Sequence, residues 1–200
     1  MRLLKFSISI TLIIILSFCN NANAESLKNK IHELKILQIN YGGNNFKVNS
    51  ENILIMKGLY ETGTSGSSDI YTVFIKQKKD WQMVRMEEGT SESIINIASP
   101  FYEQSLNSLR FMIPKNDDSS KNISTLYLIK AKRSVIHTNI DAVPVVFTLF
   151  KLSPENDEFG TRYFNQLTSV KTKAKYCGVE ESFFHELNIA TPNGENYNCP

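Results

Sequence analysis

Hydrophobic and aromatic positions occur in short runs that are separated by polar, turn-forming segments. Ile70–Ile75 and Trp81–Met86 are rich in β-branched and aromatic residues, and a short polar segment separates them. Two such runs joined in this way predict a β-hairpin. Val145–Leu152 and Thr161–Val170 form a second pair of the same kind. The nearly continuous apolar run at the start of Val145–Leu152 predicts a central strand that is covered on both faces.

The rest of the pattern is also typical of a β protein, with one helix near the C-terminus. Val179, Phe183 and Leu187 recur at four-residue spacing, which predicts one face of a short helix. Many short strands and one C-terminal helix predict a mainly β fold, either a β-sandwich or a curled antiparallel sheet. The further strand candidates are Lys35–Ile39, Ile53–Lys57, Ser93–Ile97, Leu109–Ile113 and Thr125–Ala131.

Residues 1–24 have the three parts of a secretory signal peptide. Arg2 and Lys5 precede the apolar run Ile8–Phe18, and small residues follow up to Ala24. We therefore expect cleavage after Ala24, a single β-rich domain over residues 25–200, and a periplasmic location. The apolar run is shorter than the ~20 residues that span a bilayer, and no transmembrane segment is expected. Lipid attachment at Cys19 is less favoured, because bulky Phe18 precedes it where lipoprotein signals have a small residue.

Removal of the signal peptide also changes the charge balance. The chain has 22 basic and 20 acidic side chains, and these become equal in number once Arg2 and Lys5 are lost. Lys76, Lys78 and Lys79 form a basic run, but it falls in the predicted hairpin turn and is expected to be solvated. Nucleic-acid binding requires a clustered basic face. No nucleic-acid partner is therefore expected.

Cleavage leaves Cys177 and Cys199 as the cysteines of the exported chain. Two cysteines in an oxidising compartment predict one disulfide. A metal or redox pair would require C-x-x-C spacing or nearby histidines. The turn-rich segment after residue 190 has few apolar residues, so a Cys177–Cys199 disulfide would hold it against the predicted helix.

The sequence contains no recognisable catalytic or metal-binding motif. No serine has a lysine three positions later, so the S-x-x-K site of β-lactam-reactive enzymes is absent, and so is G-x-S-x-G. His32, His137 and His185 are scattered rather than clustered as zinc ligands are. We therefore expect no enzyme activity, no catalytic residues, no cofactor and no metal.

Two blocks of sequence together carry a family resemblance. The first block comprises Lys57, Gly58, Glu61, Ser68–Ile75 and Trp81, and the second comprises Phe147–Leu152, Phe159, Gly160, Tyr163, Phe164, Lys175–Glu180, Phe183, Glu186 and Leu187. These blocks resemble the CarG-like periplasmic proteins, which are associated with self-resistance in carbapenem-producing bacteria. The loop 62–68, made of small polar residues, differs from the pattern of that family. The resemblance implies a mainly β, exported, non-hydrolytic protein that protects its host from a β-lactam.

Two functional hypotheses follow from these observations. In the first, the protein binds a β-lactam or shields its cell-wall target. In the second, it is an interaction protein of the inhibitor or immunity type that presents loops 62–68 and 115–122 to a protein partner. For Trp81, which shares a strand face with Met83, we favour a structural role in the core over a contact role. The candidate interaction residues are Ser65, Ser67, Asp69, Trp81, Asp117 and Asp118.

The predicted disulfide can be tested directly. Thiol titration of the denatured, unreduced exported protein should find no reactive cysteine. Replacing Cys177 with alanine should lower the free energy of unfolding by at most ~3 kcal/mol, because the disulfide would close a loop of roughly twenty residues. Two reactive thiols per chain would contradict the prediction.

Overall fold

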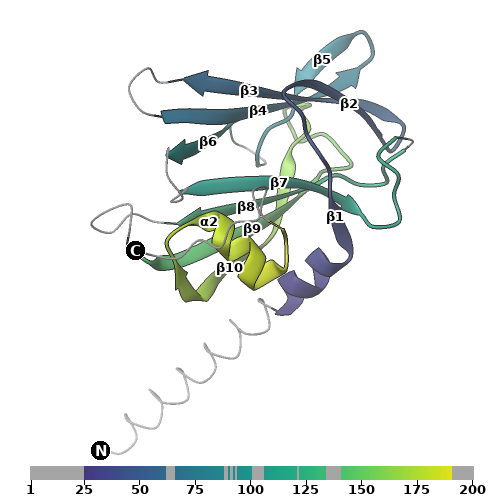
Figure 1. The fold of residues 1–200 in the computed structure, drawn as a ribbon. Helices are drawn as coiled ribbons and strands as arrows, with labels where there is room; N and C mark the ends of the chain where they lie inside the picture. The colour runs from purple at the N-terminus through teal and green to yellow at the C-terminus, as the bar shows by residue number, and fades with distance from the viewer. Residues whose placement is uncertain are drawn as a thin grey trace, which may run out of the picture.

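The computed structural model describes residues 25–61, 66–87, 90, 92, 94–100, 106–120, 122–133 and 141–190. The predicted signal peptide lies outside these residues. Two antiparallel sheets pack face to face (Figure 1). Sheet A has the strand order β1-β7-β8-β9-β10. Its strands are β1 (Leu34–Ile36), β7 (Asn107–Pro114), β8 (Tyr127–Arg133), β9 (Val143–Leu152) and β10 (Phe164–Tyr176).

Sheet B has the order β2-β3-β4-β5, and β6 pairs with β4 beside β5. The β4–β5 hairpin confirms the first predicted pair of strands, and Lys78 takes a left-handed conformation in its turn, with φ 54°. The antiparallel β9–β10 pair confirms the second. The strands of sheet B are β2 (Gly42–Val48), β3 (Glu51–Glu61), β4 (Gly66–Gln77), β5 (Asp80–Met83) and β6 (Ile94–Pro100).

The main hydrophobic core lies between the two sheets. Successive side chains of a strand point to opposite faces, so alternate residues of each strand enter this core. Tyr71 packs against Phe111 across the core, with ring centroids 5.9 Å apart. The buried residues include Ile53 and Ile55 of β3, Tyr71, Val73 and Ile75 of β4, Leu109, Phe111 and Ile113 of β7, and Phe150 and Leu152 of β9.

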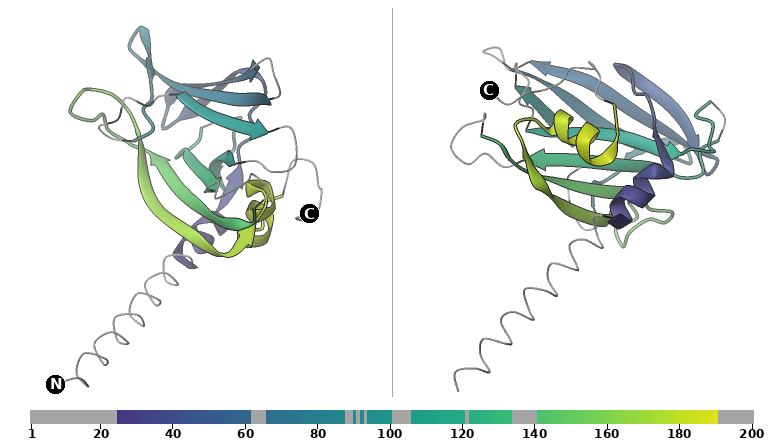
Figure 2. Two further views of the ribbon diagram at one scale, coloured as in Figure 1. Left: turned by 90° about the vertical axis from the view of Figure 1, so that its left-hand side faces the viewer. Right: turned by 60° about the horizontal axis from the view of Figure 1, so that its bottom comes forward.

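Two helices cover the outer face of sheet A and create a second core. Residues 25–32 form the first helix, and α2 (Val179–Leu187) is the predicted C-terminal helix. Figure 2 shows both helices on the same side of the sheet. Phe183 of α2 meets Phe147 of β9 edge to face, with centroids 5.2 Å apart. β9 thus contributes Phe147 and Leu149 to the second core and Phe150 to the first, which confirms the prediction of a central strand covered on both faces.

The prediction that Trp81 has a structural role in the core is wrong. Trp81 and Met83 share a face, as predicted, but Trp81 is 41% exposed and Met83 is 43% exposed. Val84 and Met86, on the opposite face, are buried in the core. The indole lies on the outer surface of sheet B, which no helix of the described residues covers (Figure 1). It pairs with Lys76, whose ammonium lies 5.7 Å from the ring centroid.

The sequence pattern missed two elements. The strand β2 contains Gly42, Gly43, Asn44 and Asn45, which are residue types depleted in strands. The first helix was not predicted either, although Leu27 and Ile31 bury one face of it. Within the described part of the chain, no helix is long and apolar enough to cross a membrane.

The second core provides a matched pair of variants. Phe183 is fully buried, whereas its neighbour Phe184 is 49% exposed. Phe183→Ala should lower the free energy of unfolding by ~3–5 kcal/mol, because it leaves a cavity beneath α2. Phe184→Ala should change it by less than about 0.5 kcal/mol. Chemical denaturation measures both, and equal effects of the two substitutions would contradict this account of the packing.

Candidate functional site

The inward face of sheet B ends in a polar group of residues. Ile53, Ile55 and Lys57 lie on one face of β3, and Asp69, Tyr71 and Val73 lie on the matching face of β4. The register pairs Ile55 with Val73 and Lys57 with Tyr71. The same alternation that places isoleucines in the core therefore turns Lys57 inward at the end of the sandwich. We call Tyr41, Lys57, Asp69 and Tyr71 the polar cluster.

Asp69 is the centre of the polar cluster. Its Oδ1 accepts a hydrogen bond of 2.7 Å from the Tyr41 hydroxyl. Its Oδ2 lies 3.0 Å from the Lys57 ammonium and at 3.5 Å, a weak hydrogen-bond distance, from the Tyr71 hydroxyl. The Lys57 ammonium also lies 4.3 Å from the centroid of the Tyr41 ring and 5.6 Å from that of Tyr71. One carboxylate and two aromatic rings therefore hold the ammonium in place.

The pKa values of Lys57, Tyr71 and Tyr41 are all raised. Burial by itself would lower the pKa of Lys57, but the hydrogen bond to Asp69 and the nearby Tyr71 and Asp69 outweigh it, so the pKa is raised. Burial raises the pKa of the Tyr71 phenol, and the hydrogen bond to Asp69 raises that of Tyr41. At neutral pH the cluster therefore presents an ammonium and two phenolic hydroxyls, and it offers no deprotonated amine or phenol.

A hollow of about 360 Å³ opens beside the cluster, and we call it the inter-sheet pocket. Lys57 and Tyr71 line it from sheet B, and Leu109, Arg110 and Phe111 line it from sheet A. It lies where the chain leaves sheet A. β1 pairs with residues 112–114 of β7, and Leu37 donates to the Phe111 carbonyl before the chain crosses to sheet B. The crossing residues Ile36, Leu37, Gln38 and Ile39, together with Ala190, complete the lining.

The second cation of the inter-sheet pocket, Arg110, is held by α2. Its guanidinium forms an ion pair with Glu180 in the first turn of α2 and donates a hydrogen bond of 2.9 Å to Ser108. Ser108 in turn donates to the same carboxylate. The guanidinium also lies 5.1 Å from the centroid of the Phe183 ring. These contacts fix the position of the guanidinium and join α2 to β7.

The arrangement suits an anionic or carbonyl-bearing ligand. Lys57 and Arg110 line the same pocket from opposite sheets, whereas their carboxylate partners, Asp69 and Glu180, are not among the lining residues. The Tyr71 hydroxyl and the Gln38 amide add further donors to a wall of mixed polar and apolar surface. A concave site with a few convergent polar groups is typical of small-molecule binding.

The predicted interaction residues do not form one site. Asp69 belongs to the polar cluster, and Ser67 pairs through its backbone with Glu61 and Ser99. Ser65 lies outside the described residues. Trp81 is on the exposed outer face of β5.

The described residues next to the two predicted contact loops lie at opposite ends of β3. Residue 123, just after loop 115–122, pairs with Val48 at the start of the β2–β3 turn. β3 then runs for 11 residues to Glu61 beside loop 62–68, a length of about 35 Å at the usual rise per residue. The hypothesis that these loops are presented to a protein partner stays a prediction.

Asp117 and Asp118 have roles within their own loop. Asp117 accepts hydrogen bonds from the backbone amide and the hydroxyl of Ser124, at 2.6 and 2.8 Å. Asp118 accepts from the amide and hydroxyl of Ser120, at 2.9 and 2.8 Å. A role for either in binding a partner stays a prediction. Cys177 is buried at the start of α2, and Cys199 lies outside the described residues, so the disulfide also stays a prediction.

Sequence reasoning identified Asp69 but missed Tyr41, Lys57, Tyr71 and Arg110 as site residues. A signal for Lys57 was present: the run Ile53-Leu54-Ile55-Met56-Lys57 places a lysine in phase with the buried isoleucines. Arg110 gave no such signal, since a polar residue between Leu109 and Phe111 is normal for a strand with one solvated face. Only the position of α2 over that face shows that the arginine is enclosed.

The fold has a counterpart among solved structures. The crystal structure of CarG matches this chain with a TM-score of 0.60, and the match covers 76% of this chain and 94% of that chain. The sequence identity over the match is 14%. The chain thus has a CarG-like fold, as the sequence resemblance implied. No family model matches the chain, and the search of curated proteins finds no match.

The polar cluster predicts a loss of stability at alkaline pH. Lys57, Tyr41 and Tyr71 have raised pKa values, so each holds its proton more tightly in the folded than in the unfolded state. Their contribution is present below the ordinary pKa values of about 10 and is lost as the pH rises through the raised ones. The denaturation midpoint should fall above about pH 10 in the wild type.

Asp69→Asn should make this alkaline fall shallower, because it removes the carboxylate that raises the pKa of Tyr41 and Lys57. Asp80→Asn, at the exposed start of β5, is the matched control and should keep the wild-type pH dependence. The same alkaline slope in wild type and Asp69→Asn would contradict the assignment.

Proposed function

We propose that the protein is exported and protects its cell from a β-lactam by binding the drug, without turnover, in the inter-sheet pocket. The main observation in support of this proposal is that Lys57 and Arg110 line the pocket from opposite sheets. The resemblance to the CarG-like proteins and the CarG-like fold support the choice of ligand. Export rests on the signal-peptide pattern of residues 1–24.

The pocket chemistry fits a carbapenem in three respects. A carbapenem carries one carboxylate on a small bicyclic ring, and an ammonium and a guanidinium are strong partners for a carboxylate. Its carbonyl oxygens can accept hydrogen bonds from the Tyr71 hydroxyl or the Gln38 amide. The volume of about 360 Å³ lies within the usual range for small-molecule sites, about 300–1,000 Å³.

The protonation states favour binding over catalysis. Ring opening needs a nucleophile that a neighbouring base has activated or that has a lowered pKa. Lys57, Tyr41 and Tyr71 all have raised pKa values, and the carboxylate of Asp69 is engaged by the Lys57 ammonium and the Tyr41 hydroxyl. A ligand in the pocket would therefore meet hydrogen-bond donors and positive charge.

The interaction-protein hypothesis has support from a different surface than the one first predicted. The register of β3, β4 and β5 places Met56, Phe74, Trp81 and Met83 on the outer face of sheet B. Met56, Trp81 and Met83 are exposed there. An aromatic and two methionines on one surface are the residue types enriched in protein interfaces. Binding of a protein partner by this face is the second candidate function.

Calorimetric titration with a carbapenem tests the first proposal. The purified protein should bind one molecule per chain and leave the ring absorbance unchanged over many equivalents of drug. Lys57→Met should weaken binding about tenfold or more, because it removes a charged hydrogen-bond donor. Lys79→Met, in the exposed β4–β5 turn, should bind as the wild type does.

Two outcomes would reject the proposal. Sustained loss of ring absorbance would show turnover and establish a hydrolase. Absence of binding, together with unchanged drug tolerance of a susceptible host that exports the protein, would exclude protection through this pocket.

A further inference from the structure

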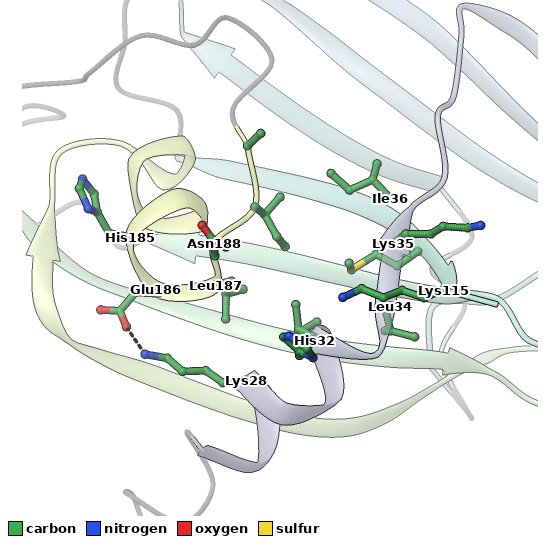
Figure 3. A pocket seen from close by; sticks show the side chains of 14 residues that line it. Lys28, His32, Leu34, Lys35, Ile36, Lys115, His185, Glu186, Leu187 and Asn188 are labelled. Carbon is green, nitrogen blue, oxygen red and sulfur yellow. Dashed lines mark ion pairs between the residues drawn. The ribbon is translucent and has the colours of Figure 1, made fainter. Parts of the chain in front are cut away.

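A second hollow lies on the helix-covered face of sheet A, and Lys57, Tyr71 and Arg110 of the proposed β-lactam site do not line it. It has a volume of about 470 Å³. The first helix bounds it on one side, and the end of α2 with the following residues 188–190 bounds it on another (Figure 3). β1 runs along its edge. We call it the inter-helix groove.

The groove has an apolar floor. Leu34, Met112 and Ile189 are buried residues of the second core and line it from below, and Ile31 and Leu187 line its sides. Ile36, at the edge, is 40% exposed. The two helices therefore leave a gap over the outer face of sheet A, and buried residues of the second core form its floor.

The rim of the groove is basic. Lys28 and His32 come from the first helix, Lys35 from β1, Lys115 from the end of β7 and His185 from α2. In Figure 3 the Lys115 side chain extends across Leu34 toward His32. Basic side chains from several elements thus surround the apolar floor.

One carboxylate, that of Glu186, lines the groove, and its oxygens are engaged. Oε2 lies 3.4 Å from the Lys28 ammonium, drawn as a dashed line in Figure 3, and Oε1 accepts a hydrogen bond of 2.7 Å from Tyr176. Lys35 donates to the backbone carbonyl of Asp117, which orders its side chain and leaves its charge uncompensated by that contact. The lining therefore keeps an excess of lysines over carboxylates.

We propose that the inter-helix groove binds a single-chain amphiphilic anion, with the chain on the apolar floor and a carboxylate or phosphate head at Lys115 and His32. An inorganic anion would leave the floor exposed to water, and an uncharged lipid would leave the basic rim without a partner. An amphiphile satisfies both parts, because burying its chain removes apolar surface from water and its head meets charged donors.

This groove and the inter-sheet pocket share Ile36 and Ala190 as lining residues. The proposal nevertheless stands independently of the β-lactam site, because Lys115 and His32 do not line the inter-sheet pocket and Lys57 does not line the groove. Variants at these positions therefore separate the two sites.

Calorimetric titration of the exported protein with decanoate, kept below its micelle-forming concentration, tests the proposal. Decanoate should bind one per chain, and decanol and inorganic phosphate should each bind far more weakly. Lys115→Glu and His32→Glu should each weaken decanoate binding about tenfold or more, since each reverses or adds charge at the head group. Lys57→Met should leave it unchanged, as should Lys171→Glu on exposed β10.

Co-sedimentation with vesicles identifies the source of the anion. Retention on vesicles that contain the single-chain lysophosphatidylglycerol, abolished by Lys115→Glu, would indicate a lipid source, whereas binding of decanoate without such retention would indicate a free amphiphile. Equal affinity for decanol and decanoate would overturn the proposal, as would wild-type affinity in both charge variants. Binding of decanoate that Lys57→Met abolishes would also overturn it, by placing the anion in the inter-sheet pocket.

Discussion

Burial of sheet A on both faces is the constraint on which the rest of the structure depends. Strands β7 and β9 supply core residues to both sides, with Phe111 facing sheet B and Met112 facing the helices. A polar residue in such a strand must find a partner, because burying an unpaired charge is costly. Arg110 finds it in Glu180 and Ser108. The same ion pair docks α2 against β7, so the helix cover and the position of the guanidinium on the helix-covered face have one cause.

The two hollows follow from the shortness of β1. This strand covers three residues of β7 before the chain crosses to sheet B. Before the crossing, β1 and the first helix leave a gap beside α2 that becomes the inter-helix groove. After it, the end of sheet B faces an uncovered stretch of β7, and Lys57, Tyr71 and Arg110 line the inter-sheet pocket there. A longer β1 that continued along β7 would close the inter-sheet pocket.

The sequence predicted the strands whose alternation or apolar runs are strong, and it missed features that depend on neighbours. β4, β5, β9 and β10 were predicted as pairs because their β-branched and aromatic runs are unambiguous. β2 was missed because a Gly-Gly-Asn-Asn segment becomes a strand only by pairing with β3, where the Asn44 side chain also bonds the backbone of Asn40. Trp81 was placed on the correct face of its strand, but one sequence cannot tell which face a sheet leaves uncovered. Lys57 and Arg110 are 53 positions apart in the sequence, and they line one pocket only because the two sheets pack together.

The pocket residues come from strands, and this bears on the difference from the CarG-like pattern that the sequence predicts. That difference falls in loop 62–68, whereas the pocket takes Lys57 from β3, Tyr71 from β4 and Arg110 from β7. Strand residues are fixed by register: Lys57 pairs with Tyr71, and Ile55 with Val73 deeper in the core. A change of loop residues leaves that register intact, because the hydrophobic alternation of both strands specifies it. The proposed binding site therefore depends on the fold that the chain shares with CarG, and its chemistry depends on side chains that the divergent loop does not supply.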